Sequence, residues 1–253
     1  MLPEERLNKI LEHIKENKSA EVDELAKLFG ASKSTIRRDL KKLDRKDIVQ
    51  RTHGGAVLAN VSTSYEKKAQ EKRMINPNKK QHIGKIAAKY VYENESILLD
   101  SGSTTLQVAK NLYDISDLTV ITYDLRIAID TELSSNSSIL LTGGVRRNGF
   151  EVLVGSETEK FISKLSVDKA FLGADAIDFK SGITNATFAE VSIKQEIIKS
   201  AKEVILVADH TKFNNIALVH VTSLDKIDKI ITDKEISSDV LEKLEEKGLE
   251  VIY

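Results

Sequence analysis

The chain has 253 residues, of which 41% are hydrophobic and 30% are charged, and its formal net charge is -1. This is the composition of an ordinary globular protein with enough chain for a sizeable core, in one large domain or in two smaller ones. The sequence contains no cysteine, which excludes disulfides and cysteine-ligated metals and favours a reducing cytoplasm, and it has neither a membrane-spanning apolar run nor the apolar core of a signal peptide.

The first 45 residues predict three short helices. Apolar residues repeat at helical spacing from Pro3 to about Glu16, and a second helix is expected from about Glu21 to Leu28, with Leu28 among its inward-facing residues. Gly30 provides a tight turn, and Ser32 is a plausible N-cap for the third helix. A short helix, a glycine turn and a further helix form a helix-turn-helix pattern.

The most informative stretch, from Ser32 to Ala56, reads SKSTIRRDLKKLDRKDIVQRTHGGA. Between Ser32 and His53 it holds eight basic residues against three aspartates, a local charge of +5. Ile36, Leu40 and Leu43 lie at i, i+4 and i+7 and predict the buried stripe of the third helix. The basic and hydroxyl residues of that helix are therefore expected on its solvent face.

A β-hairpin is predicted directly after this helix. Residues 48–52 read as a strand, Gly54-Gly55 as a tight turn, and Ala56 begins the returning strand. A basic helix followed by such a wing indicates sequence-specific binding of double-stranded DNA, with the helix in the major groove; a solvated helix face is the alternative explanation of the charge alone. The residues expected to contact DNA are Ser32, Lys33, Ser34, Thr35, Arg37, Arg38, Lys41, Arg51 and His53.

The roles of these residues follow from their chemistry. Arg37 and Arg38 are candidates for base or phosphate contact, and Ser32, Ser34 and Thr35 for contacts that position the phosphate backbone. One small winged helix makes limited contact, so we expect a homo-oligomer that binds paired half-sites.

Small, polar and charged residues from Asn60 to Lys80 predict a linker, part of it helical. We therefore assign residues 1–60 to a winged helix-turn-helix domain, residues 61–80 to the linker and residues 81–253 to a larger domain. In the larger domain, short apolar strands alternate with helices, which predicts a mostly parallel α/β sheet. Strands are expected at 96–99, 118–122, 138–142, 168–172, 203–208, 229–232 and 250–252, and helices at about 80–92, 104–113, 125–133, 157–164, 188–201 and 238–247.

The first strand end of the larger domain carries a hydroxyl-rich loop, Asp100-Ser101-Gly102-Ser103-Thr104-Thr105. The loop leads into a predicted helix, and the unpaired N–H groups and the dipole of a helix N-terminus suit a phosphate. Simple N-capping by Ser103 or Thr104 is the alternative. The spacing is not that of a Walker A loop.

Further polar or glycine clusters follow the other strands, at Thr122-Tyr123-Asp124, Gly143-Gly144, Gly173-Ala174-Asp175 and Asp209-His210-Thr211-Lys212. Ligands bind open α/β sheets at the carboxyl ends of the strands, so the clusters predict one crevice for a phosphorylated polyol. Lys194 lies on a predicted helix and either points to solvent or reaches this crevice. The five histidines are scattered without metal-ligand spacing and no G-x-S-x-G motif occurs, so neither a metal nor another cofactor is expected.

Motifs in both parts of the chain resemble DeoR-type transcriptional regulators. The runs STIRRDL (34–40) and RTHGGA (51–56) resemble the winged-helix domain of that family. The loop at 100–105, Gly143-Gly144, Gly173-Ala174-Asp175 and the run ADHTKF (208–213) resemble its C-terminal sensor domain. The resemblance covers essentially the whole chain.

This resemblance implies a bacterial cytoplasmic regulator, usually a repressor of sugar or nucleoside catabolism. Its sensor domain would be similar to ribose-5-phosphate isomerase and would bind a phosphorylated sugar, with the phosphate at Ser101 to Thr105. Tyr123 and Ala176 stand where the family often has Asn and Gly, which predicts an altered crevice shape. The residues expected to bind the effector are Asp100, Ser101, Gly102, Ser103, Thr104, Thr105, Thr122, Gly143, Gly144, Asp175, Lys194 and Lys212.

The sequence therefore predicts a two-domain regulator without enzymatic activity, with a phosphorylated sugar and operator DNA as its partners and with no membrane association. An active sugar-phosphate isomerase with a DNA-binding tail is one alternative, because carboxylates and a lysine near a phosphate loop can transfer protons. A constitutive DNA binder with a vestigial crevice is the other.

Overall fold

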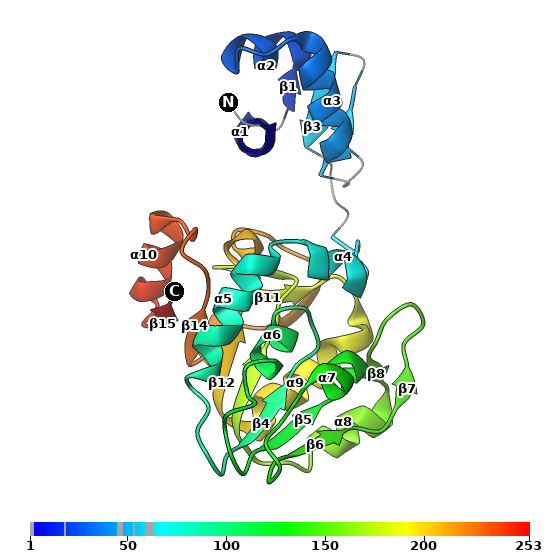
Figure 1. Ribbon diagram of the computed structural model, residues 1–253, viewed down its shortest axis with the longest axis vertical. Helices are drawn as coiled ribbons and strands as arrows, with labels where there is room; N and C mark the ends of the chain where they lie inside the picture. The colour runs from blue at the N-terminus through cyan, green and yellow to red at the C-terminus, as the bar shows by residue number, and fades with distance from the viewer. Residues whose placement is uncertain (1–2, 18, 45–47, 53, 59–62) are drawn as a thin grey trace. The chain divides into compact units, whose positions relative to one another are not determined.

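The computed structural model describes residues 3–17, 19–44, 48–52, 54–58 and 63–253 (Figure 1). The chain forms two compact units, Met1–Ser62 and Thr63–Tyr253. Residues 63–80, which the sequence analysis assigned to a linker, thus cluster with the second unit. They contain one short helix and the beginning of a longer one.

The first unit combines a helix-turn-helix with a three-stranded antiparallel sheet in the order β1-β3-β2. Gly30 takes a φ of +60° between the second and third helices, a conformation that costs glycine little. A core that includes Ile10, Leu25, Ile36 and Val49 joins the helices to the sheet. The elements are α1 (Pro3–Asn17), β1 (Ser19–Glu21), α2 (Val22–Leu28), α3 (Lys33–Asp44), β2 (Val49–Arg51) and β3 (Gly55–Leu58).

Two details of this unit differ from the sequence-based prediction. The break after the first helix contains strand β1, whose Ala20 pairs with Ala56 of the wing. Leu28, which was expected to face inward, is 56% exposed. Phe29 packs against the core in its place, because it lies four residues after Leu25 and so continues the buried face of α2.

A seven-stranded parallel sheet forms the centre of the second unit, in the order β15-β14-β12-β9-β4-β5-β6. All seven strands were predicted from the sequence to within two residues at each end. They are β4 (Ser96–Leu99), β5 (Thr119–Thr122), β6 (Ser138–Leu141), β9 (Val167–Leu172), β12 (Ala201–Val207), β14 (Lys229–Ile231) and β15 (Glu250–Ile252).

Helices cover both faces of this sheet, because side chains alternate along each strand. Ile97 and Leu99 of β4 pack in one core with the helices at residues 77–88, 105–109 and 125–130. Leu98 packs in the core on the opposite face, with the helices at residues 156–162, 191–200 and 238–246. The helices are α5 (Pro77–Ala88), α6 (Thr105–Ala109) and α7 (Leu125–Asp130) on the first face, and α8 (Ser156–Ile162), α9 (Val191–Ser200) and α10 (Ser238–Glu246) on the second.

The remaining elements were not predicted individually. A small antiparallel sheet has the order β10-β11-β13, and a hairpin pairs β7 with β8. Over the described part of the chain, we find no helix with the length and apolarity to cross a membrane. These elements are α4 (Ala69–Met74), β7 (Val145–Arg146), β8 (Leu153–Val154), β10 (Ala176–Asp178), β11 (Gly182–Asn185), β13 (Val219–Thr222) and the 3-10 helices η1 (Phe188–Glu190), η2 (His210–Lys212) and η3 (Leu224–Lys226).

Candidate nucleic-acid interface and ligand crevice

Helix α3 of the first unit places its apolar and basic residues on opposite faces. Ile36, Leu40 and Leu43 are at most 3% exposed, as expected for the buried stripe, whereas Arg37 and Arg38 are exposed. A recognition helix needs this arrangement, since the buried stripe leaves the basic face turned to solvent. The other α3 residues expected to contact DNA are Lys33, Ser34 and Lys41, which are exposed, and Thr35, which is half-buried.

Three hydroxyl groups gather at the N-terminus of α3. Ser32 Oγ accepts the backbone N–H of Thr35 at 3.2 Å, which confirms Ser32 as the N-cap. The same oxygen lies 2.8 Å from Ser34 Oγ and from Thr35 Oγ1. Beside them, Lys33 Nζ pairs with Asp23 at 2.7 Å. Hydroxyls, free N–H groups and the helix dipole together suit a DNA phosphate.

A buried ion pair fixes the orientation of α3. Asp39 is 2% exposed, and Arg6 Nε of α1 donates to its Oδ2 at 2.7 Å. The local charge of +5 counted from the sequence includes the negative charge of Asp39. Its burial withdraws this carboxylate from the solvent face, which is therefore more basic than the count implied.

The wing is the hairpin of β2 and β3. The Arg51 side chain is exposed and its backbone N–H donates to Asp44 Oδ1 at 3.1 Å. A Cβ at Gly55 would lie 2.1 Å from the carbonyl oxygen of Ala20, so only glycine allows β1 and β3 to approach at this point. His53, the other wing residue expected to contact DNA, lies outside the described residues.

In the second unit, the strand order reverses between β4 and β9. Strands β5 and β6 follow on one side of β4, and the chain then returns to place β9 and β12 on the other side. Ligands bind open α/β sheets at such a switch point, outside the carboxyl ends of the strands. Asp100 follows β4 and Gly173 follows β9, and the Gly173 N–H donates to Asp100 Oδ2 at 2.7 Å. We call the group of polar side chains at these two strand ends the crevice.

Asp100 and Lys194 form a buried ion pair at the floor of the crevice. Asp100 is 0% and Lys194 4% exposed, and Lys194 Nζ donates to Asp100 Oδ2 and, at 3.0 Å, to the Gly173 carbonyl. Of the two orientations that the sequence left open for Lys194, the structure has the one that reaches the crevice. Neither charge is exposed, so each needs the other for compensation.

Tyr123 connects this floor to the hydroxyl loop. Its OH donates to Asp100 Oδ1 at 2.5 Å and lies 3.0 Å from Ser101 Oγ and 3.1 Å from Glu190 Oε2. Burial and the adjacent Asp100 carboxylate raise the pKa of Tyr123, which keeps the phenol neutral. Ser101 Oγ donates to Glu190 Oε2 at 2.5 Å. The residue that departs from the family pattern therefore organises the crevice floor.

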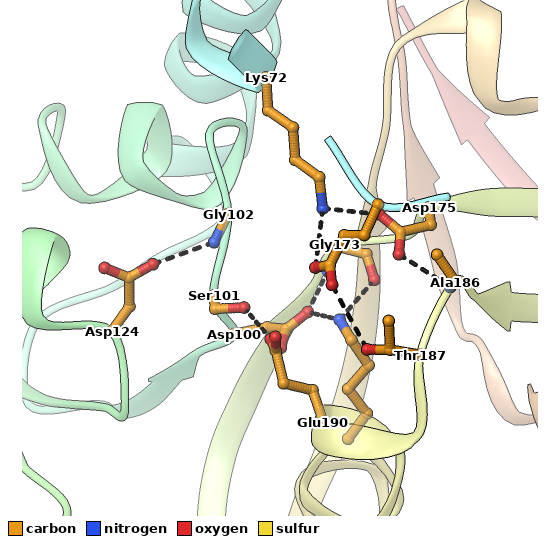
Figure 2. A network of polar contacts seen from close by, with 12 residues as sticks. Lys72, Asp100, Ser101, Gly102, Asp124, Gly173, Asp175, Ala186, Thr187 and Glu190 are labelled. Carbon is orange, nitrogen blue, oxygen red and sulfur yellow. Dashed lines mark hydrogen bonds and ion pairs between the residues drawn. The ribbon is translucent and has the colours of Figure 1, made fainter. Parts of the chain in front are cut away.

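Figure 2 shows Lys72, from α4, pointing into the crevice toward Asp175. Lys72 Nζ lies 2.8 Å from Asp175 Oδ1, and the Ala186 N–H donates to Asp175 Oδ2 at 3.1 Å. Burial raises the pKa of Asp175, but the attraction of Lys72 outweighs burial and holds the pKa below its usual range. Lys212 contributes to the same attraction, and burial lowers its own pKa. Asp175 is thus held ionised at the rim.

A hollow of about 140 Å³ lies beside Ser103, on the side of α5, α6 and α7. Lys80 in its wall is only 4% exposed, and burial lowers its pKa to about 8. Because small-molecule sites usually start at about 300 Å³, this hollow suits a compact anion. Four cationic side chains against one carboxylate line it, the complete set being Arg73, Pro77, Lys80, Gln81, Ser103, Leu106, Gln107, Lys110, Arg126 and Asp130.

Other residues of the hydroxyl loop are engaged within the fold. Thr105 is fully buried and its hydroxyl donates to the Gly102 carbonyl at 3.0 Å, and Thr104 is 8% exposed. The Gly102 N–H donates to Asp124 Oδ2 at 3.2 Å, and burial raises the pKa of Asp124 to about 6. The Thr122 hydroxyl, also fully buried, donates to the Leu99 carbonyl at 2.9 Å. Ser101 and Ser103 are the two loop hydroxyls that face the crevice and the hollow.

The glycine pair after β6 contacts α8. The Gly143 carbonyl accepts a hydrogen bond from the Thr158 hydroxyl at 2.7 Å. A Cβ at Gly144 would lie 2.2 Å from the Thr158 Oγ1 atom. In the described part of the chain, these contacts pack α8 against the end of β6, and none of them joins the glycines to Asp100.

Sequence reasoning missed several residues of the crevice. Glu190 lies four residues before Lys194, so the spacing of a single helical face could have revealed it. Arg147 of the β7–β8 hairpin donates to Glu190 Oε1 at 2.9 Å and to Glu66 Oε2 at 2.5 Å. Neither Arg147 nor Lys72 follows a predicted strand, so nothing local in the sequence marked them.

Asp209, His210 and Asp233 offer potential metal ligands within 4.8 Å of one another. His210 Nδ1, however, lies 2.9 Å from Asp233 Oδ1, and the His210 backbone N–H donates to the same carboxylate at 2.8 Å. Asp209 accepts from Thr211 and Asn76. Hydrogen bonds within the protein thus engage His210, Asp233 and Asp209 Oδ1, whereas Asp209 Oδ2 is buried without a hydrogen-bond partner among the described residues.

A winged helix-turn-helix with an exposed basic helix, joined to an α/β unit with polar side chains gathered at its switch point, is the architecture of a ligand-responsive DNA-binding regulator. The comparisons agree with this class. Residues 6–62 match the DeoR-like helix-turn-helix domain, and residues 75–234 match the DeoR C terminal sensor domain. The chain therefore belongs to the DeoR family of transcriptional regulators.

Full-length relatives support the assignment. The HTH-type transcriptional regulator GlpR of Haloferax volcanii is 34% identical, over 100% of this chain and 98% of its own. The glycerol-3-phosphate regulon repressor of Escherichia coli K12 is 30% identical, over 98% of this chain and 97% of its own. Among solved structures, a D-ribose-5-phosphate isomerase in complex with phospho-erythronic acid is 20% identical, with a TM-score of 0.40 over 54% of each chain.

Proposed function

We propose that this protein is a cytoplasmic repressor of a sugar-catabolism operon, and that a phosphorylated sugar bound in the second unit controls its affinity for operator DNA. The observation that carries the proposal is the cation-lined hollow at Ser103, next to the crevice that holds Asp175 and Lys194. The name of the Escherichia coli relative, a glycerol-3-phosphate regulon repressor, favours a phosphorylated polyol.

In this proposal the phosphate and the sugar occupy adjacent places. The phosphate lies in the hollow against Ser103, Lys80 and Arg126, where charge-assisted hydrogen bonds are strong. The sugar hydroxyls lie toward the crevice, where Asp175 accepts hydrogen bonds and Lys212 donates them. Operator DNA lies against the solvent face of α3 and against the wing.

The crevice binds the sugar phosphate without converting it, because the two carboxylates at its floor are already engaged. Asp100 is bound to Lys194, and Glu190 is bound to Ser101 and Arg147. A general base needs a carboxylate within reach of a substrate proton. An assay of aldose and ketose phosphate turnover tests this part, and interconversion by the purified protein would refute it.

Arg38→Ala should weaken operator binding by about 1–3 kcal/mol, because the exposed guanidinium of α3 contacts a base or a phosphate. The measurement is fluorescence anisotropy at fixed salt, with a duplex selected from a randomised pool. Lys9→Ala, on the exposed side of α1, is the matched control and should bind like the wild type. Equal affinity of Arg38→Ala and Lys9→Ala would remove Arg38 from the interface.

Ser103→Glu should abolish the response to sugar phosphates and leave operator binding intact, because it places a carboxylate where the phosphate binds. Ser135→Glu introduces the same charge at an exposed turn and should respond normally. Thermal-shift titration with a panel of sugar phosphates measures the response, since a ligand at 100 times its dissociation constant adds about 2.7 kcal/mol of stability. A retained response in Ser103→Glu would place the phosphate elsewhere.

We further propose that the protein acts as a homo-oligomer. Two winged helices joined by symmetry can bind two half-sites of an operator, whereas a single one makes limited contact. Sedimentation of the protein with and without its selected duplex tests the oligomeric state.

A further inference from the structure

Residues 63–74, which we call the strap, form the first segment of the second unit and are covalently continuous with the DNA-binding unit. The strap includes α4 and carries two charged side chains that reach the crevice. Glu66 Oε2 accepts Arg147 Nη2 at 2.5 Å, and Lys72 Nζ lies 2.8 Å from Asp175 Oδ1 and 3.5 Å from Glu66 Oε1. Figure 2 shows the Lys72 amine joined by a dashed line to Asp175.

These ion pairs are largely withdrawn from water. The side chains of Glu66, Arg147, Asp175 and Lys72 are 9%, 17%, 18% and 25% exposed. Burial by itself would lower the pKa of Lys72, but Asp175 and Glu66 outweigh it and raise the pKa, so the amine is charged. Removing one partner of a pair shielded to this degree leaves an uncompensated charge, whereas removing one partner of an exposed pair costs little.

The next residue of the strap reaches the phosphate side of the same site. Arg73 lines the hollow at Ser103, and its Nη1 donates to Glu151 Oε2 at 2.5 Å. Lys72 and Arg73 thus extend from one short helix to the two places that the proposed function assigns to sugar and phosphate. A sugar hydroxyl bound to Asp175 replaces the Lys72 amine and so removes one of the contacts that hold the strap.

We propose that the strap is the element that couples the crevice to the DNA-binding unit: the effector and Lys72 of the strap compete for Asp175, and the effector releases the strap. This inference rests on the proposed function and names its route of regulation. With the strap bound, the chain leaving Thr63 is fixed to the sensor unit and the protein binds operator. With the strap released, that constraint on the DNA-binding unit is lost.

Competition of this kind is reciprocal. Weakening the strap contacts lowers operator affinity without effector and raises affinity for effector, and the typical coupling between two such sites is about 5- to 150-fold. Glu66→Gln is the variant that tests this, because the amide keeps the shape of the side chain and loses its charge toward Arg147 and Lys72. Glu71→Gln, an exposed carboxylate on the same strap, is the matched control.

The first measurement needs no effector. Hydrogen exchange of residues 63–74 and anisotropy with the selected duplex are compared for the wild type, Glu66→Gln and Glu71→Gln. We expect faster exchange of the strap and at least 5-fold weaker duplex binding only in Glu66→Gln. If Glu66→Gln exchanges and binds like Glu71→Gln, the strap proposal is overturned.

The second measurement titrates the same proteins with glycerol 3-phosphate, ribose 5-phosphate, fructose 1-phosphate and fructose 6-phosphate, with inorganic phosphate as reference. A compound that binds the wild type should bind Glu66→Gln more tightly; equal or weaker binding would overturn the competition. If no compound binds the wild type, the sugar-phosphate proposal fails, and the exchange and duplex data still decide whether the strap controls DNA binding.

Discussion

Replacing Lys194 with methionine should lower the free energy of unfolding of the second unit by about 3–5 kcal/mol, because the substitution leaves the Asp100 carboxylate without its cation. Asp100 has no exposed surface, and the Gly173 N–H and the Tyr123 OH are the neutral donors that stay with it. Neutral hydrogen bonds compensate a buried charge less well than an ammonium does. The measurement is urea denaturation followed by circular dichroism, with linear extrapolation to water.

Lys199→Met on the same helix is the matched control for Lys194→Met. Lys199 pairs with Glu196, but its side chain is 68% exposed, so its loss should cost less than about 1 kcal/mol. Adding Asp100→Asn to Lys194→Met should recover part of the stability, because it removes the unpaired charge. A Lys194→Met protein as stable as Lys199→Met would show that the ion pair does not hold the crevice floor together.

The main sheet was predictable because each of its strands is a short apolar run between turn residues. Buried parallel strands require this pattern. Strands β10 and β11 are short and pair through polar or glycine residues such as Asp178 and Gly182, so no periodicity distinguishes them from loops. Their position depends on contacts made across the fold, which the local sequence does not encode.

The crevice was predictable for a topological reason, and only in part. The carboxyl ends of parallel strands meet at one edge of a sheet, so Asp100 and Asp175 could be placed there from strand positions alone. Lys72 and Arg147 could not be placed there from the sequence. Lys72 comes from a segment that resembled a linker, and Arg147 comes from a hairpin whose strands are two residues long. Lys72 belongs to the strap and Arg147 contacts Glu66 of the strap, so the proposed coupling was invisible in the sequence.

Replacing Lys80 with methionine should reduce affinity for the phosphorylated effector by about 1.5–3 kcal/mol, the contribution of a hydrogen bond to a charged group. Lys80 lines the hollow, and its Nζ donates to the Lys72 carbonyl at 2.5 Å. Burial lowers its pKa to about 8, so it is mostly charged at pH 7 and neutral above pH 9. Effector affinity of the wild type should therefore fall as the pH rises through about 8.

Proton linkage explains why effector affinity falls, rather than rises, as the pH increases. Bound phosphate stabilises the protonated amine, so binding takes up a proton above pH 8, and affinity falls by up to about tenfold per pH unit. Below about pH 6 affinity also falls, because the phosphate loses its second charge. Asp124, with a pKa of about 6, titrates in the same acid range, so the alkaline limb alone reports on Lys80.

Calorimetric titration from pH 6 to pH 9.5 distinguishes this role from a structural one. The alkaline fall attributed to Lys80 should disappear in Lys80→Met, because methionine has no proton to lose, whereas a packing defect would lower affinity equally at every pH. Lys79→Met, the neighbouring residue of α5, should keep the wild-type profile. If effector affinity of Lys80→Met still falls at alkaline pH as in the wild type, the titrating group is Lys212, whose pKa is also lowered by burial. The phosphate would then bind near the end of β12.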